Sequence, residues 1–498
     1  MRLIALILSI SLLTGSLKAQ WKEVQFDDSD MALDLAEAKT YQKYPTYPQY
    51  VEMMQNFAAD FPHICKLDTF GTSTQGRLLL ALKISDHPLE EEAEANFLYT
   101  STIHGDELLG FNLLLRLADT LLQGYGSDSE ITGLVDSLAI WINPLANPDG
   151  SYMNDNNLSL KQAMRDNANG IDLNRSFPDP SKGEPDDTTG REPENKAMMD
   201  FLWKHGIIMS ANLHSGEEVV NYPWDYTFDL HADDPWYRFI SREYADEARA
   251  IDPTYMELFT DGITNGAEWY VIKGGRQDYV NYYLGGREVT LELSKTFLLG
   301  SELLEEHWIL NRRSLLNYMS QCTYGIRGKV TDKESGEPLR ARIHIPYHDS
   351  SYSVVHSFAD FGDYYRLIKE GVYDLVFSAP GYLNDTITGV NFTDYQATYL
   401  DVALERDPSA GLLSPRNVPN FSIFPNPVSQ QLFIESIFVP YGPVEISIHG
   451  LDGLTYLQTS LYNSGKVLEV RTDFLQEGFY ILQINHPRLS KSFGFIKQ

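Results

Sequence analysis

An apolar run that ends in a polar cluster near position 104 is the feature that most limits how this chain can fold. Residues 97–103 are rich in side chains that favour strands. Beyond the cluster, apolar residues recur at three- and four-residue steps over 108–121, which is typical of a helix with a buried face. His104 and Glu107 therefore stand where a strand ends and a helix begins.

Similar alternation of strand and helix patterns continues to residue 319. The expected strands are 65–67, 78–84, 138–142, 207–213 and 287–294, and the expected helices are 50–61, 192–205 and 303–319. Polar, turn-rich loops at 143–150 and 167–179 interrupt the pattern. Strands that alternate with helices indicate an α/β sheet domain whose functional site lies at the strand ends.

The helical period disappears after Tyr324. Short strand signals separated by Gly, Pro and Asp occur at 326–330, 341–345, 363–367 and 373–377. They predict a small all-β module at 324–405, followed by a Pro- and Ser-containing linker at 406–420 and a second all-β module at 421–498. Neither β module contains a constellation of metal ligands or nucleophiles in its sequence.

The first residues have the pattern of a secretory signal peptide. Met1-Arg2 precede a short apolar run, and Leu17-Lys18-Ala19 indicates cleavage after Ala19. The run is too short to span a membrane, so residues 1–19 predict export of a soluble protein. Residues 20–43 are acidic and are expected to form a leader segment or a short ordered arm.

Charge and cysteine content limit the possible partners. The 498-residue chain has a formal net charge of -30, which the phosphate backbone of nucleic acids would repel. An acidic surface suits cationic peptide partners, although it also serves simply to keep a protein soluble. The two cysteines, Cys65 and Cys322, are too few for a disulfide scaffold, and the sequence leaves open whether they pair.

Residues with metal-binding chemistry stand at two of the expected strand ends. The spacing of His104 and Glu107 lets an imidazole and a carboxylate reach one zinc ion from a single turn, but such a pair alone is a weak signal. His214 follows the apolar run 207–213 and supplies a second imidazole, unless it is simply a hydrogen-bonded core histidine. Two imidazoles and one carboxylate leave a coordination position for water, as a catalytic zinc requires.

Residues 44–317 resemble the zinc metallocarboxypeptidase family, and within it the regulatory subgroup of carboxypeptidases D, E and N. The resemblance is specific because several motifs occur together in one order. They are His104-x-x-Glu107, Asn147-Pro-Asp-Gly150, Asn167-Ala-Asn-Gly-Ile-Asp-Leu-Asn-Arg175, Leu213-His214-Ser-Gly, Asn221-Tyr-Pro-Trp-Asp225, Gly274-Gly-Arg-Gln-Asp278 and Thr290-Leu-Glu-Leu-Ser294. The resemblance implies a catalytic domain at 44–323 with a mixed central sheet flanked by helices. It also implies that the module at 324–405 is transthyretin-like.

The resemblance further implies a role for each ligand and for a general base. One zinc ion, held by His104, Glu107 and His214, would lower the pKa of bound water and polarise the scissile carbonyl. Glu292 matches the family's general base, which takes the water proton and passes it to the leaving amine. Glu288 has the same strand parity as Glu292, but it is expected to be structural.

Four further residues match family positions, one catalytic and three substrate-binding. Arg165 is expected to stabilise the oxyanion, although it would otherwise be read as a surface arginine. Asn174 and Arg175 are expected to bind the free terminal carboxylate of the substrate. Asp225 is expected to pair with a terminal Lys or Arg in the specificity pocket, unless it only caps a turn.

The family also uses a mobile tyrosine that covers the bound peptide, and here the chain departs from the pattern. Animal members of the subgroup read Gln-Asp-aromatic-Asn-Tyr, whereas this chain reads Gln277-Asp-Tyr-Val-Asn281-Tyr282-Tyr283. The extra residue leaves the register open. Tyr282 is the expected residue because it follows Asn281, and Tyr279 and Tyr283 are the alternatives.

The last module resembles the C-terminal sorting domain of the bacterial type nine secretion system. The motifs that carry this resemblance are Phe424-Pro-Asn-Pro-Val428, Ile446-Ser-Ile-His-Gly-Leu-Asp-Gly453, Leu475-Gln-Glu-Gly-Phe-Tyr-Ile-Leu482 and the basic Lys491. They imply secretion machinery of the outer membrane as a partner, and release or attachment at the cell surface. The alternative is a β-sandwich that binds carbohydrate or protein.

Together these patterns predict a secreted, monomeric zinc metallocarboxypeptidase that removes Lys or Arg from peptide C-termini and binds no nucleic acid. One alternative is a carboxypeptidase for aliphatic, aromatic or cell-wall peptide ends. Another is an inactive peptide-binding relative, but such relatives commonly lose a ligand or the glutamate base, and this chain retains both. A pure adhesin would leave the polar residues at the strand ends unexplained.

Overall fold

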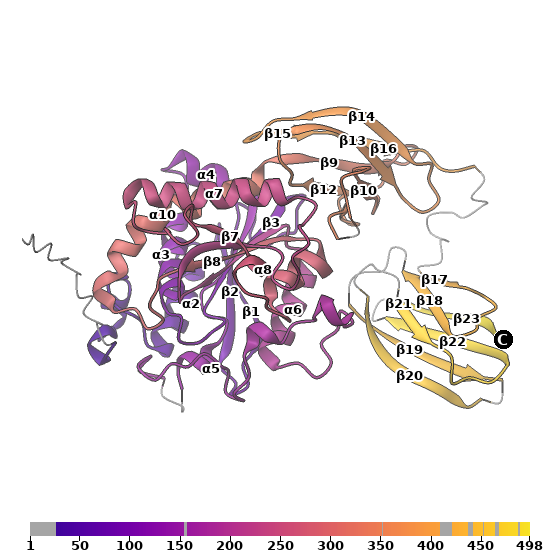
Figure 1. Ribbon diagram of the computed structural model, residues 1–498, viewed down its shortest axis with the longest axis horizontal. Coiled ribbons are helices and arrows are strands. Elements are labelled where there is room, and N and C mark those ends of the chain that lie inside the picture. The colour runs from indigo at the N-terminus through magenta and orange to yellow at the C-terminus, as the bar shows by residue number, and fades with distance from the viewer. Residues whose placement is uncertain are drawn as a thin grey trace, which may run out of the picture.

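The computed structural model contains one α/β domain followed by two β modules (Figure 1). It describes residues 26–153, 157–350, 352–408, 421–436, 442–451, 453–463, 468–486 and 489–498. The predicted signal peptide at 1–19 lies outside these residues, as does most of the predicted linker, 409–420. Within the described part of the chain, no helix has both the length and the apolar character needed to cross a membrane.

An eight-stranded mixed sheet forms the centre of the α/β domain, with the strand order β1-β2-β4-β3-β5-β8-β6-β7. The strands are β1 (Cys65–Thr72), β2 (Leu78–Ile84), β3 (Ala95–Ser101), β4 (Leu138–Asn143), β5 (Met209–His214), β6 (Glu218–Tyr222), β7 (Ile263–Asn265) and β8 (Arg287–Leu293). Strands β4, β3, β5 and β8 are parallel neighbours, and β6 and β7 are parallel to each other. The pairs β1–β2, β2–β4 and β6–β8 are antiparallel. The predicted α/β class with a mixed sheet is confirmed.

Helices cover both faces of this sheet, and each face has its own apolar cluster. The longer helices are α2 (Tyr47–Asp60), α3 (Leu109–Gly124), α4 (Ser129–Val135), α6 (Pro193–His205), α7 (Asp234–Ile251) and α10 (Leu304–Ser320). Alternate residues of β3 point to opposite faces: Phe97 and Tyr99 join the cluster with α2, α3, α7 and α10, whereas Leu98 joins the cluster with α6.

Short helical turns complete the domain. They are η1 (Asp28–Asp30), α1 (Leu35–Ala38), α5 (Pro148–Ser151), η2 (Leu173–Arg175), η3 (Pro180–Lys182), α8 (Gly266–Trp269), α9 (Arg276–Tyr279), η4 (Val280–Leu284), η5 (Ser301–Leu303) and η6 (Gln321–Thr323). Residues 26–43 pack onto the domain, since Phe26 and Met31 belong to its core and Asp30 accepts a 2.8 Å hydrogen bond from the backbone N–H of Ser301. This part of the expected leader is an ordered arm.

The two cysteines lie in the α/β domain and do not pair. Cys65 begins β1 and Cys322 lies in η6, and both are buried free thiols. Burial raises the pKa of each thiol to about 12. Both side chains therefore act as small apolar groups in the core rather than as a disulfide.

The first β module (residues 325–404) consists of two small sheets that share a core. Its strands are β9 (Gly325–Asp332), β10 (Arg342–His344), β11 (Val355–His356), β12 (Asp363–Arg366), β13 (Gly371–Ser378), β14 (Asp385–Phe392), β15 (Ala397–Tyr399) and β16 (Val402–Leu404). Ile326 and Tyr364 from one sheet meet Ile343 and Phe377 from the other in this core. The strands predicted near residues 326, 341, 363 and 373 are present; the transthyretin-like identity stays a prediction.

The second β module (residues 421–498) also has two sheets, β17-β18-β21 and β20-β19-β22-β23. Its strands are β17 (Phe421–Phe424), β18 (Gln431–Ser436), β19 (Gly442–Gly450), β20 (Thr455–Asn463), β21 (Leu468–Arg471), β22 (Gly478–His486) and β23 (Leu489–Lys497). Alternating residues such as Val444, Ile446 and Ile448 point inward from β19 to form its core. The module thus has the inside–outside alternation expected of a small β-sandwich.

Candidate active site

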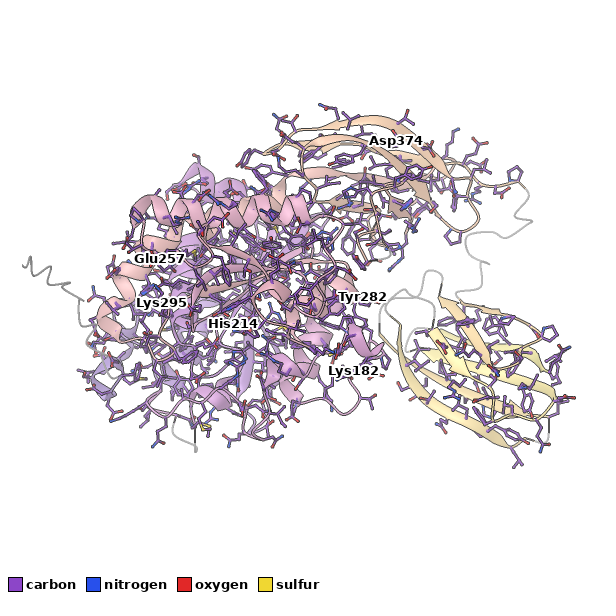
Figure 2. All side chains as sticks on the ribbon, in the orientation of Figure 1. Lys182, His214, Glu257, Tyr282, Lys295 and Asp374 are labelled. Carbon is purple, nitrogen blue, oxygen red and sulfur yellow. The ribbon has the colours of Figure 1, made fainter. Side chains whose placement is uncertain are left out.

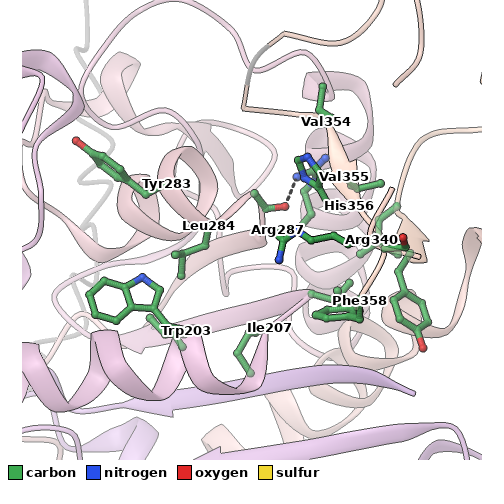
Figure 3. Close-up of a pocket in the computed structure, with 17 residues that line it drawn as sticks. Trp203, Ile207, Tyr283, Leu284, Arg287, Arg340, Val354, Val355, His356 and Phe358 are labelled. Carbon is green, nitrogen blue, oxygen red and sulfur yellow. Dashed lines mark hydrogen bonds between the residues drawn. The ribbon is translucent and has the colours of Figure 1, made fainter. Parts of the chain in front are cut away.

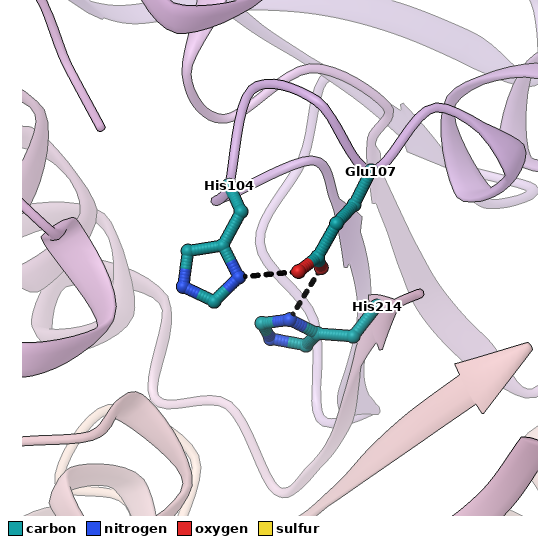
Figure 4. Close-up of side chains that lie close together, drawn as sticks. All are labelled: His104, Glu107 and His214. Atoms are coloured by element: carbon teal, nitrogen blue, oxygen red, sulfur yellow. Dashed lines mark hydrogen bonds and ion pairs between the residues drawn. The ribbon is translucent and has the colours of Figure 1, made fainter. Parts of the chain in front are cut away.

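The three predicted metal ligands meet at the carboxyl ends of two neighbouring strands (Figure 4). His104 and Glu107 follow β3, and His214 is the last residue of β5. Nδ1 of His104 lies 2.7 Å from Oε1 of Glu107, and Nδ1 of His214 lies 2.7 Å from Oε2 of the same carboxylate. The ligand atoms all lie within 4.8 Å of one another, and all three residues are buried.

The outer nitrogen of each imidazole is held by a neighbouring side chain. Nε2 of His104 lies 3.2 Å from Oδ1 of Asp172, and Nε2 of His214 lies 2.7 Å from Nδ2 of Asn212. Such partners fix the ring orientation and leave Nδ1 of both histidines directed at the same point. A buried set of two imidazoles and one carboxylate converging in this way fits zinc.

The sequence analysis assigned no role to these two supporting residues, although signals for both were available. Asp172 stands inside the motif that ends at Arg175, and Asn212 precedes His214 by two residues, which places both side chains on one face of β5. Burial acts to raise the pKa of Glu107, but His104 and His214 outweigh it and hold that pKa below its ordinary value. The carboxylate is therefore charged and suited to a cation.

Arg165 lies beside the ligand cluster. Its guanidinium is 2.9 Å from Oδ2 of Asp172 and 3.6 Å from Oε1 of Glu107. The side chain remains 40% exposed, so part of the guanidinium faces the open side of the site. Asp172 therefore orients both His104 and Arg165.

A pocket opens over the ligands and brings most of the predicted residues together. The predicted residues that line it are His104, Glu107, Arg165, Asn174, Arg175, His214, Asp225 and Glu292. Asn174 is oriented by the backbone N–H of Arg276, which donates a 2.9 Å hydrogen bond to its Oδ1. Residues from widely separated stretches of sequence thus converge on one cavity.

The two glutamates of β8 have different environments. Glu292 lies opposite His214 in the parallel register of β8 and β5, and no described residue forms a hydrogen bond with its Oε2. Burial, together with the negative charge of Glu107, raises the pKa of Glu292 well above its ordinary value. Glu288 instead forms a fully buried ion pair with Arg276 through contacts of 3.0 and 2.8 Å. Only Glu292 faces the pocket.

Asp225 lies in the wall of the same pocket. Nδ2 of Asn221 and Nε2 of Gln277 each donate a 3.0 Å hydrogen bond to its Oδ1. Burial raises the pKa of Asp225 from 3.8 to about 6. A side chain at Gly266 would collide with this carboxylate, since its Cβ would lie 1.8 Å from Oδ1. Gln277, to which the sequence analysis assigned no role, thus helps to orient the Asp225 carboxylate.

The structure does not bring Tyr282 into the pocket, which corrects the sequence prediction. In Figure 2 Tyr282 lies to the side of His214, and its ring packs against Trp224 and Tyr352. The physical reason is the winding of α9 and η4, which turns this stretch into the apolar cluster around α6. The alternatives, Tyr279 and Tyr283, are buried in that cluster as well.

The tyrosine that lines the pocket is Tyr270, which follows α8 and is 47% exposed. The sequence analysis missed it because it belongs to none of the recognised motifs. The available signal was an aromatic pair, Trp269-Tyr270, a few residues before the motif that begins at Gly274. Trp269 also lines the pocket.

Comparisons with known proteins agree with this geometry. A family model described as zinc carboxypeptidase matches residues 50–313, and one described as secretion system C-terminal sorting domain matches residues 422–498. Carboxypeptidase D of Rattus norvegicus is 35% identical over 351 residues, which are 68% of this chain and 25% of that protein. Carboxypeptidase N catalytic chain of Mus musculus is 31% identical over 404 residues, 74% of this chain and 87% of that protein.

A solved structure shares the fold. The crystal structure of thrombin activatable fibrinolysis inhibitor matches with a TM-score of 0.50 and 20% identity, covering 58% of this chain and 77% of that chain. The match to carboxypeptidase D spans only about a quarter of that longer protein. The zinc carboxypeptidase match nevertheless covers more than half of the 498 residues. The predicted resemblance is confirmed, and the chain belongs to the zinc carboxypeptidase family, with a secretion sorting domain at its C-terminus.

Proposed function

We propose that the protein is an exported carboxypeptidase that hydrolyses the last peptide bond of peptides ending in Lys or Arg. The observation that carries this proposal is one pocket that contains a candidate metal-binding triad, a buried aspartate, and a glutamate whose Oε2 accepts no hydrogen bond from any described residue. His104, Glu107 and His214 would hold one zinc ion. When bound, zinc supplies a Lewis acid that lowers the pKa of water and polarises a carbonyl group.

The remaining chemistry belongs to side chains of this chain. Glu292 accepts a proton from water and returns it to the leaving amine, a role that its unpartnered Oε2 supports. Arg165 stabilises the negative charge that develops on the substrate oxygen, because its exposed guanidinium is held beside the ligands by Asp172. Asn174 and Arg175 bind the free carboxylate of the substrate, and Tyr270 covers the bound peptide in place of Tyr282.

The preference for Lys or Arg rests on Asp225. A buried carboxylate is unfavourable without a cationic partner. Among the described residues, the side chains that donate to Asp225 are the neutral amides of Asn221 and Gln277, and the charge of Arg175 acts on Asp225 without a hydrogen bond. Oδ1 of Asn221 and Oε1 of Gln277 also accept no hydrogen bond from any described residue. Asn221 and Asp225 both line the pocket, so a guanidinium or ammonium group that enters it would donate to both side chains.

The domain arrangement fits an exported enzyme. We propose that residues 44–323 are the catalytic domain, 324–405 a transthyretin-like module, 406–420 a linker and 421–498 the sorting domain. Residues 1–19 would direct export, and the sorting domain would engage outer-membrane secretion machinery, so the enzyme would act in the medium or at the cell surface. A polybasic or basic-ended peptide would also be attracted to the chain's net charge of -30.

The test is hydrolysis of matched acyl-peptides that end in Arg, Lys, Phe or Ala, with and without a zinc chelator. Chelator-sensitive release of Arg and Lys, with little release of Phe and Ala, is the expected result. Release of Phe or Ala in preference would retain the metal chemistry and reject the role of Asp225. Failure to cleave any of the four, with zinc bound, would reject the proposed activity.

A further inference from the structure

The first β module contacts both ends of the loop that carries Asp225. Residues 223–233, which we call the Asp225 loop, join β6 to α7. Asp225 lies near the start of this loop and Asp233 is its last residue. Trp224, the immediate neighbour of Asp225, and Asp233 both contact side chains of the first β module. Side-chain contacts therefore connect the loop that carries Asp225 directly to the first β module.

At the start of the loop the link is aromatic. Trp224 is fully buried, and the ring of Tyr352 from the first β module meets it edge to face, with centroids 4.8 Å apart and planes at 85°. The same tyrosine ring lies 5.3 Å from the ring of His231, further along the loop. His231 in turn lies 5.0 Å from Trp224. Tyr352 thus packs against two separate residues of the Asp225 loop.

At the end of the loop the contact is a buried ion pair. Nη1 and Nη2 of Arg366, in the first β module, donate to the two carboxylate oxygens of Asp233 at 2.8 and 2.9 Å. His348 of the same module lies 2.8 Å from Asp233, and Arg287 of β8 donates to it at 2.8 Å. The side chains of Arg366 and Asp233 are both 0% exposed. Asp233 cannot shift without separating buried charges, which is strongly unfavourable.

A pocket lies beside these contacts, between the α/β domain and the first β module. It is lined by Trp203 and Leu284 on one side and by Val354 and Phe358 on the other (Figure 3). The side chains of the β module that contact the Asp225 loop are Tyr352 at its start and His348 and Arg366 at its end.

We propose that the first β module is a positioning element for the specificity pocket, and that Tyr352 and Arg366 hold the Asp225 carboxylate where it receives the cationic end of the substrate. This inference rests on the proposed function, in which Asp225 selects Lys or Arg. The metal ligands and Glu292 are delivered by β3, β5 and β8 instead. Loosening the Asp225 loop therefore changes selectivity and leaves the hydrolytic chemistry intact.

The experiment compares Tyr352→Ala, Tyr352→Phe and Tyr395→Ala in the full chain with zinc bound. Tyr395 is the matched control, because it belongs to the same module but packs on Phe239 of α7, with centroids 5.4 Å apart. The measured quantity is the ratio of kcat/KM for an acyl-peptide ending in Arg to that for one ending in Ala. Tyr352→Ala should lower this ratio about tenfold by weakening Arg cleavage alone, while the other two variants keep the ratio of the parent protein.

A double variant distinguishes a positioning role of Tyr352 from a general loss of activity. With Asp225→Ala already present, Tyr352→Ala should have no further effect on the ratio, since the two residues act through one pathway. Equal losses for both substrates, or a loss that persists in the Asp225→Ala background, would overturn the inference. An unchanged ratio in Asp225→Ala alone would refute the proposed pocket, and the inference with it. A normal Asp225 effect with no Tyr352 effect would refute only the inference.

Hydrogen exchange provides a readout that does not depend on activity. Tyr352→Ala should speed amide exchange across residues 223–233, while the amides of β3 and β5 stay as protected as in the parent protein. Tyr352→Phe, which retains the ring, should restore slow exchange. Unchanged exchange in the Asp225 loop of the Tyr352→Ala protein would show that this ring does not hold the loop.

Discussion

Replacing Asp225 by Asn should weaken the selection of basic residues and at the same time stabilise the fold. Asn has nearly the same shape and retains an Oδ1 acceptor for the hydrogen bonds from Asn221 and Gln277. It lacks the charge that, in our proposal, pairs with the substrate cation. A charge-assisted hydrogen bond contributes about 2 kcal/mol, so kcat/KM for an Arg-ended peptide should fall about thirtyfold relative to an Ala-ended one.

The gain in stability follows from the pKa of the same group. The pKa of Asp225 is raised from 3.8 to about 6 in the folded protein. Below pH 3.8 the group is protonated in both the folded and the unfolded states, and above about pH 6 it is charged in both. Above that pH the folded protein carries a penalty of about 3 kcal/mol, at 1.36 kcal/mol per pKa unit. The Asn variant avoids this penalty.

Urea unfolding at pH 7.5 and pH 4, followed by tryptophan fluorescence, measures this gain. The chain has seven tryptophans and all precede the first β module, so the signal reports on the α/β domain. The variant should be more stable than the parent protein at pH 7.5 and nearly equal to it at pH 4. Asp374→Asn, an exposed carboxylate in β13, is the matched control and should change neither quantity. A variant that is less stable than the parent at pH 7.5 would refute the reasoning.

Three further perturbations test other parts of the molecule. Arg366→Met should lower the free energy of unfolding in the same urea titration by about 3–5 kcal/mol, because the buried charge of Asp233 loses a cationic partner. Lys333→Met, the control, breaks an exposed ion pair and should change it by less than about 1 kcal/mol. Glu292→Gln should lower kcat about 10²–10⁴-fold with unchanged zinc content by metal analysis. Tyr270→Phe should lower kcat/KM for peptides several-fold, and Tyr282→Phe, outside the pocket, should not.

The strand ends of the site could be predicted from the sequence because two local signals coincide there. An apolar run that stops at a polar residue marks the end of a buried strand, as at His104 and His214. Parallel neighbouring strands deliver such residues to one edge of the sheet, and this is how the ligands of β3 and β5 meet. The order of strands in the sheet was not needed for that inference.

Sequence reasoning did not resolve the region from 226 to 273 into elements, although it contains a helical signal. Helix α7 buries Trp236, Tyr237, Ile240, Tyr244 and Ala248 on one face, together with Ser241 and Ala245. Its apolar and polar residues are well segregated, but its mean hydropathy is low because charged residues fill the opposite face, so a search for apolar runs passes over it. Strand β7 has only three residues, too few for a period-two pattern to be recognised.

The misplacement of Tyr282 has a different physical cause. Tyr282 was chosen because it follows Asn281 in the motif, without regard to the direction of its side chain. In a helical segment a shift of one residue rotates the side chain by about 100° around the axis. Residues 276–284 are wound as α9 and η4, so neighbouring tyrosines point in different directions. One extra residue in the motif therefore decides which rings enter the core and removes all three candidates from the pocket.

The buried charges at the interface were invisible in the sequence for a more general reason. Asp233 and Arg366 are separated by 133 positions, and each residue by itself is expected on the surface. Asp233 also pairs with Arg287 of its own domain, and Arg366 pairs with Asp349 of its own module, but the complete set of buried ion pairs forms only when the α/β domain and the first β module are folded and docked together. Docking is therefore coupled to the folding of both units. If the Asp225 loop is positioned by this contact, the specificity pocket reaches its final shape only after the two units have joined.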